Sequence, residues 1–414
     1  MNIFSTVVLA LIFARAAMQF WLEKLNQRHV LAHSEKVPEA FQAVIDEPTY
    51  QKSVAYTLAK SNFHQKELAF DTFLLLAILF SGFLPWFYDS FQKYFGISVW
   101  SQAAFIFATG VLLSIPGLPF AWNSQFRLED RFGFNTTTQK VWWLDRVKGL
   151  LLALVLGYPL LVFILKLVQW TVDLWWLFAF ACVLGFQLLM MVLAPVLILP
   201  LFNKFTPLSD GTLRERLLAL GKKTGFHAKS IQVMDGSKRS RHSNAFFTGF
   251  KRFRKIVLFD TLIQQLTEPE LEAVLAHEIG HYKKKHIPKM LLWSAATLFL
   301  TFYIISVLAQ QNWFYEAFRF HNDDIVIALL LFSLLSGVIT FWFSPLAHWW
   351  SRKHEYEADR YAAETTGQPT WIINALRKLN EKNLSNLTPH PIYSGFYYSH
   401  PTLLEREQAL QKTA

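Results

Sequence analysis

Seven long segments of the chain consist mainly of apolar residues, and polar stretches separate them. Each segment is about long enough to form a helix that crosses a hydrocarbon layer of roughly 30 Å. The segments cover residues 4–22, 69–88, 99–121, 149–168, 174–202, 288–309 and 325–347. The pattern predicts a mainly α-helical integral membrane protein with seven transmembrane helices.

The first apolar segment stands where a secretory signal peptide would stand. No basic residue precedes it, Arg15 interrupts it, and Phe20 with Trp21 closes it in the manner of an interfacial anchor. We therefore interpret this segment as a helix that the protein retains.

The composition agrees with a membrane protein. Hydrophobic residues make up 53% of the 414 residues and aromatic residues 16%, while only 17% are charged. An ordinary soluble domain carries roughly 25% charged residues. Cys182 is the only cysteine, so the chain forms neither an internal disulfide bond nor a cysteine-based metal site.

Lysine and arginine collect in alternate polar stretches. Residues 23–68, 122–148, 203–287 and 348–414 hold 6, 5, 16 and 8 of them, which is 35 of the 40 in the chain. If all seven segments cross the membrane, these stretches share one side, which the positive-inside rule places in the cytoplasm, with the N-terminus outside. The net charge of +10 therefore reflects topology. Because no nucleic-acid-binding motif accompanies it, we expect a lipid bilayer and no nucleic acid among the partners.

The longest polar stretch has the pattern of a small α/β unit. Ile231–Met234 and Lys255–Phe259 are predicted strands, and Ser243–Phe250 is a third candidate between them. Apolar residues at helical spacing predict helices at 212–226, 351–365 and 369–383.

A further predicted helix carries the pattern His277-Glu278-Ile279-Gly280-His281. Thr267 and Glu270 form a capping box, so this helix is expected to begin there and to run into the sixth apolar segment. At about 100° per residue, His277 and His281 lie one turn apart on one face, where both imidazoles reach one metal ion. Glu278 points to the same side and reaches the open coordination position that water takes. The pattern is the HExxH signature of zinc hydrolases, although it also arises by chance.

A catalytic zinc site needs a third protein ligand. Glu355 and Asp359 follow the seventh apolar segment at i, i+4 spacing, so that one carboxylate would bind the metal and the other would hold a ligand histidine. The alternative is a solvated charged face with ion pairs to Arg352 or Arg360. Two transmembrane segments separate His281 from these carboxylates, so both regions return to the same side of the membrane. This topology favours the metal site.

Further motifs accompany these residues. They are Pro38-Glu39 with Tyr50–Thr57, Phe132–Asn135 with Thr137 and Asp145, Ser243–Gly249, His277–His281, Glu355–Asp359 and Ser399–Arg406. Together they resemble the integral-membrane CAAX prenyl endopeptidases, which are gluzincin zinc metalloproteases, over nearly the whole chain. The resemblance implies seven helices that form an intramembrane chamber, capped on the cytoplasmic side by a gluzincin-type metalloprotease domain with a small β-sheet.

The resemblance divides the chain into four parts. They are 1–202, transmembrane helices 1–5 with their cytoplasmic loops; 203–287, the metalloprotease core with the HExxH helix; 288–347, transmembrane helices 6–7; and 348–414, the C-terminal part of the metalloprotease domain.

The resemblance also implies one Zn²⁺ per chain, with His277, His281 and Glu355 as its ligands. Glu278 would be the general base and acid, and Asp359 would hold a ligand histidine in place. These roles fit zinc chemistry, because zinc lowers the pKa of bound water toward ~7 and polarises the scissile carbonyl.

Four further residues match positions that contact the substrate in this family. Asn244 and Ala245 match an edge strand that binds the substrate as an added strand. His400 and Arg406 match residues that approach the substrate or the tetrahedral oxyanion. Without the resemblance, Asn244 would be interpreted as a turn residue and His400 as a residue of a surface loop.

Two other histidines near the proposed site are given no metal-binding role. His286 directly follows Lys283–Lys285, and we interpret these four residues as interfacial anchors rather than ligands. His242 lies between basic residues, and contact with a substrate is the less favoured interpretation for it.

The leading hypothesis is a zinc-dependent membrane endopeptidase that acts near the cytoplasmic face. Its substrates would be peptides or proteins with a C-terminal CAAX-type prenylated sequence, or other membrane-associated chains. The connection between the sixth and seventh segments is short, which favours the inner membrane of a bacterium over the endoplasmic reticulum membrane. The alternatives are a heat-shock-type quality-control metalloprotease and, from a different class, a transporter or lipid-handling protein with a structural zinc.

Overall fold

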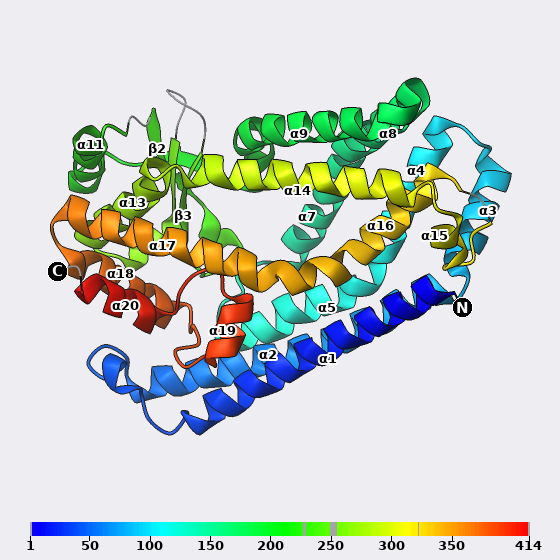
Figure 1. Ribbon diagram of the computed structural model, residues 1–414. Helices are drawn as coiled ribbons and strands as arrows, with labels where there is room; N and C mark the ends of the chain where they lie inside the picture. Colours follow the sequence, from blue (N-terminus) through cyan, green and yellow to red (C-terminus); the bar gives the residue numbers. More distant parts are fainter. Residues whose placement is uncertain (1, 227–228, 249–254, 322, 413–414) are drawn as a thin grey trace.

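The computed structural model describes residues 2–226, 229–248, 255–321 and 323–412. Most of them form helices that run along the length of the molecule, with a small sheet at one end (Figure 1). The helices of the apolar part are α1 (Ile3–Ala32), α2 (Glu47–Phe80), α3 (Phe83–Phe95), α4 (Val99–Ser114), α5 (Leu118–Asn123), α6 (Asp130–Phe132), α7 (Gln139–Leu152), α8 (Tyr158–Thr171), α9 (Trp175–Leu193), α10 (Leu199–Phe202), α14 (His286–Leu308), α15 (Asn312–Glu316) and α16 (Ile325–Thr340).

Five helical stretches in the described residues are long and apolar enough to cross a membrane, or up to six if the bent pair α2 and α3 counts as one span. The longest of them, Gln139–Phe202, has 64 residues. It contains α8 and α9, which pack against each other through Ile164 and Ala179 on either side of the short turn Val172–Leu174. If the bent pair is counted as one span and this stretch is divided at the turn into two, the described residues contain seven spans. This is the number that the hydropathy predicts.

The second apolar segment differs from the prediction. It was expected as one span over 69–88, but α2 ends at Phe80 and α3 continues at an angle of 57°. Gly82 lies between them with φ +85°, a left-handed conformation that interrupts a right-handed helix. The helix α2 also begins at Glu47 and has 34 residues, about 51 Å at 1.5 Å per residue, so it extends well beyond a bilayer.

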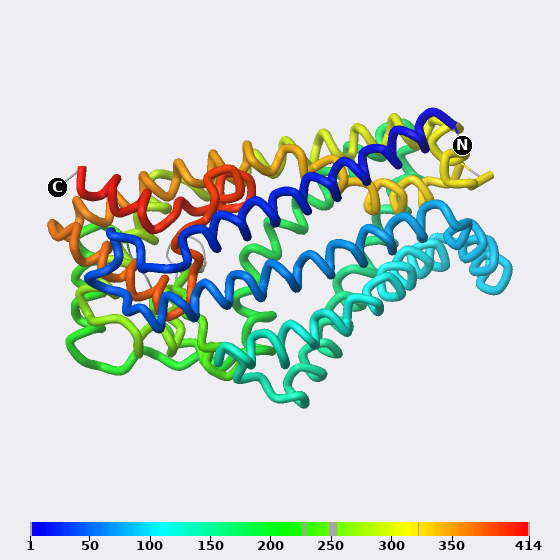
Figure 2. The backbone as a smooth tube through the Cα atoms, turned by 90° about the horizontal axis from the view of Figure 1, so that it is seen from below, coloured from blue at the N-terminus to red at the C-terminus, as the bar shows by residue number. Residues whose placement is uncertain are grey.

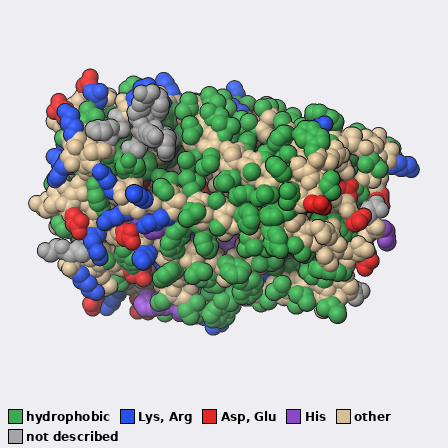
Figure 3. All heavy atoms as spheres, turned by 45° about the horizontal axis from the view of Figure 1, so that its top comes forward, with side chains coloured by type: hydrophobic (Ala, Val, Ile, Leu, Met, Phe, Trp, Pro, Cys, Tyr) green, Lys and Arg blue, Asp and Glu red, His purple; other side chains and the backbone are tan. Residues whose placement is uncertain are grey.

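The surface of the long helices is apolar. Phe73, Trp170 and Leu292 expose 68%, 64% and 73% of their area. Figure 3 shows hydrophobic side chains over the middle of the face in view, while Lys and Arg gather at the end that carries the sheet. An exposed apolar surface of this extent is a surface for lipid, which agrees with a protein embedded in a bilayer.

The sheet has four strands in the order β1-β2-β4-β3. They are β1 (Phe205–Pro207), β2 (Ser230–Met234), β3 (Ala245–Thr248) and β4 (Lys255–Phe259). The parallel pair β2 and β4 forms the centre, and β3 runs antiparallel to β4, with Ala245 opposite Leu258. All three predicted strands are confirmed within the described residues, although Gly249 and Phe250 of the third lie outside them. The short strand β1 was not predicted.

The helices at the polar end surround this sheet. They are α11 (Thr212–Thr224), α12 (Asp260–Gln265), α13 (Glu268–Lys283), α17 (Ser344–Thr366), α18 (Pro369–Lys382), α19 (Pro391–Tyr397) and α20 (Leu403–Gln411). The predicted helices at 212–226, 351–365 and 369–383 correspond to α11, α17 and α18. A short 3-10 segment, Phe341–Phe343, joins α16 to α17 in one helical run of 42 residues, so the helix with Glu355 and Asp359 continues directly from the last apolar segment.

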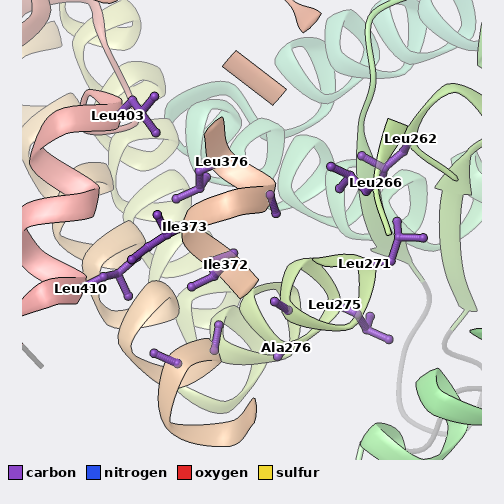
Figure 4. Close-up of a cluster of buried hydrophobic side chains, with 14 of the residues drawn as sticks. Leu262, Leu266, Leu271, Leu275, Ala276, Ile372, Ile373, Leu376, Leu403 and Leu410 are labelled. Atoms are coloured by element: carbon purple, nitrogen blue, oxygen red, sulfur yellow. The ribbon is translucent and has the colours of Figure 1, made fainter. Parts of the chain in front are cut away.

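A buried hydrophobic cluster joins α12, α13, α18 and α20 (Figure 4). Its members include Leu262, Leu266, Leu271, Leu275, Ala276, Ile372, Ile373, Leu376, Leu403 and Leu410. Burying a side chain such as leucine stabilises the fold by about 1.5–3 kcal/mol relative to leaving it exposed. The cluster therefore holds α13 against the C-terminal helices, although these segments lie far apart in the sequence. Figure 2 shows the same gathering of green, orange and red segments at one end.

Candidate metal centre

The helix α13 begins where the sequence predicts. Thr267 is its N-cap, its backbone N–H donates to Glu270 Oε2 at 2.7 Å, and a complete capping box is present. The prediction that this helix runs on into the sixth segment is wrong. It ends at Lys283, and Lys285, with φ +56°, separates it from α14. A left-handed residue other than glycine costs roughly 1–2 kcal/mol, so the surrounding packing maintains this break.

The helices α13 and α17 cross at close range. A Cβ on Gly280 would lie 3.0 Å from Cα and 3.2 Å from the carbonyl oxygen of Ala358, so only glycine allows this approach. Ala358 is fully buried at the crossing. Because the helices meet here, the face of α17 with Glu355 and Asp359 lies against the face of α13 with the two histidines.

The structure brings His277, His281 and Glu355 together. The Nε2 atoms of the two histidines lie 3.1 Å apart, and Glu355 places Oε2 3.5 Å from Nε2 of His277 and Oε1 3.4 Å from Nε2 of His281. A tetrahedral ion with bonds of about 2.0–2.1 Å spaces its ligands roughly 3.4 Å apart. Glu355 Oε2 is also buried without a hydrogen-bond partner. The spacing, the donor atoms and this unpartnered oxygen fit a metal ion.

Asp359 fixes the orientation of the first histidine. Its Oδ1 lies 2.8 Å from Nδ1 of His277, and a carboxylate accepts, so Nδ1 carries the hydrogen and, in the neutral ring, Nε2 has the lone pair that a metal ion can bind. Arg406 donates to both oxygens of Asp359, from Nε at 2.7 Å and from Nη2 at 2.5 Å. Asp359 is only 2% exposed, so this bidentate pair supplies the counter-charge that a buried carboxylate needs.

The pKa values of the two histidines are shifted in opposite directions. Burial works to lower the pKa of His277, but the nearby carboxylates of Asp359 and Glu355 outweigh it and raise the pKa to about 9. Burial, together with the neighbouring His277, lowers the pKa of His281 to about 4. Burial also raises the pKa of Glu278, although His277 opposes the shift. Glu278 therefore exchanges a proton closer to neutral pH than an exposed carboxyl group does.

The remaining predicted residues surround this centre. His400 Nε2 lies 3.5 Å from Oε1 of Glu355, and most of its side chain is exposed. Asn244 is exposed, and its carbonyl oxygen accepts from the N–H of Phe259 at 3.1 Å. Ala245 begins β3, the edge strand that packs next to α13. Arg406 lies behind Asp359, with Nη2 3.8 Å from Glu355 Oε2.

The sequence did not predict the location of His286. Its interpretation as an interfacial anchor is wrong, because the side chain is 1% exposed inside the protein. Its Nδ1 lies 2.9 Å from Nδ1 of His281, and its Nε2 lies 3.1 Å from Glu357 Oε2. The left-handed Lys285 places it there, and no sequence pattern signals such a conformation at a lysine. His242 lies apart from this group, stacked on Phe134 at a centroid distance of 4.2 Å.

Comparisons with known proteins identify the family. Residues 26–204 match the family model for the CAAX prenyl protease N-terminal region with five membrane helices, and residues 207–414 match peptidase family M48. The chain is 36% identical to CAAX prenyl protease 1 of Saccharomyces cerevisiae, over 91% of this chain and 88% of that protein. It is 29% identical to the human CAAX prenyl protease 1 homolog, over 93% and 91%.

A solved structure has the same fold. The crystal structure of S. mikatae Ste24p superposes with a TM-score of 0.91 at 34% identity and covers 99% of both chains. The predicted family and enzyme class are thus confirmed, and they are favoured over the heat-shock-type protease and the transporter. The chain belongs to peptidase family M48 and is a membrane metalloendopeptidase of the CAAX prenyl protease type.

Proposed function

We propose that this protein is a zinc-dependent endopeptidase that cleaves C-terminal CAAX-type prenylated peptides, or other membrane-associated peptides, near the cytoplasmic face. The observation that carries the proposal is the group His277, His281 and Glu355. It lies where α17 emerges from the last apolar segment and α13 precedes the sixth. A peptide held at the membrane by a lipid tail would therefore present its polar chain to this group.

One Zn²⁺ per chain would be held by Nε2 of His277, Nε2 of His281 and a carboxylate oxygen of Glu355. When bound, zinc supplies a Lewis acid that polarises the scissile carbonyl and lowers the pKa of water. Asp359 keeps the first of these histidines in the tautomer that offers Nε2, as the 2.8 Å contact at Nδ1 supports.

Glu278 would act as general base and then as general acid. It follows His277 directly on α13 and lies close enough to His277 and Glu355 for their charges to affect its pKa. In the carboxylate form it accepts a proton from the attacking water, and it then delivers that proton to the leaving amine. Its raised pKa suits both steps, because the group must hold and release the same proton.

The edge strand β3 offers a place for the substrate chain. Among the described residues β3 pairs on one side, with β4, so its other edge is a place where an extended peptide could add as a further strand. The N–H of Ala245 donates to Oδ1 of Asn244 at 2.8 Å, and a bound peptide would compete for that N–H. We assign Asn244 and Ala245 to this contact. His400 faces the same centre from the C-terminal segment, where its imidazole would contact the peptide carbonyl.

Two cavities support access from the helices to this centre. One of about 420 Å³ is lined by residues that include His400 and Arg406. The other, of about 630 Å³, lies between α1, α2 and the C-terminal segment, and both cavities have Tyr397 and Tyr398 in their walls. A chain that enters between the long helices would thus come next to His400 and Arg406, which lie 3.5 Å and 3.8 Å from the carboxylate of Glu355.

A Glu278→Gln variant of the purified protein tests the proposal. We expect wild type to contain one zinc per chain and to cleave a farnesylated CAAX peptide, and the variant to keep its zinc but lose at least 100-fold in rate, roughly the contribution of a general base. Glu272→Gln is the matched control, since Glu272 lies on α13 but pairs with Arg216. Equal rates for wild type and Glu278→Gln, or a wild type without zinc, would refute the proposal. Cleavage of the same peptide without the farnesyl group tests whether the enzyme requires a prenyl group. Equal cleavage rates for the two peptides would show that it does not.

A further inference from the structure

The second histidine of the metal centre contacts another histidine through its outer ring nitrogen. In the part of the chain that the structure describes, no carboxylate lies at Nδ1 of His281; instead Nδ1 of His286 lies 2.9 Å away. The other nitrogen of His286, Nε2, is 3.1 Å from Oε2 of Glu357. The three side chains thus form a chain from the metal centre to a carboxylate whose side chain is 35% exposed.

The hydrogens in this chain follow from the groups that it joins. A carboxylate only accepts, so Glu357 requires a hydrogen on Nε2 of His286, and the neutral ring then has its lone pair on Nδ1. That lone pair accepts, so Nδ1 of His281 must donate. The lone pair of His281 is left on Nε2, which faces Nε2 of His277 and Oε1 of Glu355. This is the tautomer that binds a metal ion at the centre.

The surrounding residues hold His286 in this orientation. Its ring stacks on His354 of α17, with centroids 4.0 Å apart and an angle of 16°, and Trp350 packs beside His354 at 4.6 Å. The left-handed Lys285 turns the chain so that His286 begins α14 under His281. A ring fixed by stacking and by hydrogen bonds at both nitrogens has little freedom to choose another partner.

We propose that His286, oriented by Glu357, is a positioning residue that sets the tautomer and ring orientation of His281 for metal binding. This inference rests on the zinc site of the proposed function. The two ligand histidines would then have different supports. His277 relies on the buried pair of Asp359 and Arg406, and His281 relies on an imidazole with a partly exposed carboxylate behind it.

The test measures zinc affinity by competition with a chromophoric chelator, in the purified full-length protein. His286→Phe keeps a ring that stacks on His354 but removes both nitrogens, and we expect zinc binding to weaken about 10–100-fold. His286→Asn places an amide oxygen near the position of Nδ1, so it should recover part of the loss. The visible absorption spectrum of Co²⁺-loaded protein should change in His286→Phe and return toward wild type in His286→Asn.

The control is His348→Phe, because His348 also lies on a packed helix and, among the described residues, its ring bonds to the carbonyl oxygen of Phe396 rather than to a metal ligand. It should keep the wild-type zinc affinity. If His286→Phe does not fold, Glu357→Leu replaces it, since a partly exposed position tolerates the change, and it should weaken zinc binding in the same direction. Unchanged zinc affinity and an unchanged Co²⁺ spectrum in the folded variant would overturn the inference.

Wild-type measurements separate this test from the proposed function. A wild type that binds zinc but cleaves no peptide refutes the proposed protease and leaves the positioning role to be decided by affinity alone. A wild type that binds no zinc overturns both.

Discussion

At the scale of single residues, the centre depends on how buried charges are paired. The carboxylate of Asp359 is 2% exposed, and it accepts hydrogen bonds from Nδ1 of His277 and from Nε and Nη2 of Arg406. Each partner needs the others, because a buried charge without a counter-charge costs several kcal/mol. The guanidinium of Arg406 suits this place because its planar fork matches the two carboxylate oxygens, which a lysine ammonium does not.

We predict that Asp359→Asn weakens zinc binding about 10–100-fold, the usual effect of losing the partner of a ligand histidine. The amide has no charge for Arg406 and its NH₂ group competes with the Nδ1 hydrogen of His277. Chelator competition measures the change. Asp145→Asn is the control, because Asp145 also forms a two-point pair with an arginine, Arg239, away from the metal centre. Equal losses in both variants would mean that Asp359 has no special role at the metal.

At the scale of elements, the crossing of α13 and α17 places the ligands opposite each other. The crossing has glycine on one helix and alanine on the other, Gly280 against Ala358. Small residues let two backbones approach, so the two helices lie close enough for His277 and His281 on α13 and Glu355 on α17 to reach one ion. The capping box at Thr267 and the hydrophobic cluster around Leu271 and Ile373 set the direction of α13.

We predict that Gly280→Ala destabilises the protein by about 1–3 kcal/mol, as overpacking a close contact does. The new Cβ would meet backbone atoms of Ala358 and Cβ of Tyr361 at 3.0–3.2 Å, which cannot move aside without separating the helices. The melting temperature in thermal unfolding and the zinc affinity should both fall. Gly185→Ala on α9 is the control, because a Cβ there meets nothing within 4 Å. A fully stable Gly280→Ala with wild-type zinc affinity would contradict the argument.

At the scale of the whole molecule, apolar helices and polar ends determine how the protein sits in a bilayer. The sheet, α11 and the metal centre share one end, and α3 lies at the other (Figure 1). We propose that the end with the metal centre faces the cytoplasm, because 35 of the 40 basic residues lie in the stretches on that side. The N-terminus would then lie outside.

Single cysteines at the two ends test this orientation. The only native cysteine is first removed by Cys182→Ala, and Lys93→Cys or Lys222→Cys is then introduced at an exposed position of each end. We expect a membrane-impermeant maleimide to label Lys93→Cys on intact cells and Lys222→Cys only after the membrane is permeabilised. The reverse pattern would show that the protein has the opposite orientation.

Interactions between residues close in sequence could be predicted from the sequence. The spacing of His277 and His281 follows from 3.6 residues per helical turn, the capping box from three-residue spacing, and the membrane segments from runs of apolar residues. The pairing of Glu355 with these histidines spans more than 70 residues; parity of the membrane segments and the family resemblance indicated it, and no local pattern did. The bend at Gly82 was missed because the hydropathy continues across it.

Tertiary structure decided what depends on backbone conformation and on contacts between distant segments. The break at Lys285 requires a left-handed lysine that only surrounding contacts stabilise, and it moves His286 from the expected membrane interface to a buried place beside His281. Arg406 lies behind Asp359 for a similar reason, since α20 packs against α18 and against α17, the helix that carries Asp359. The sequence by itself therefore determined the membrane protein, the positions of most of its long helices and the HExxH pair, through local spacing and hydropathy. Packing over long sequence separations decided which side chains support the ligands.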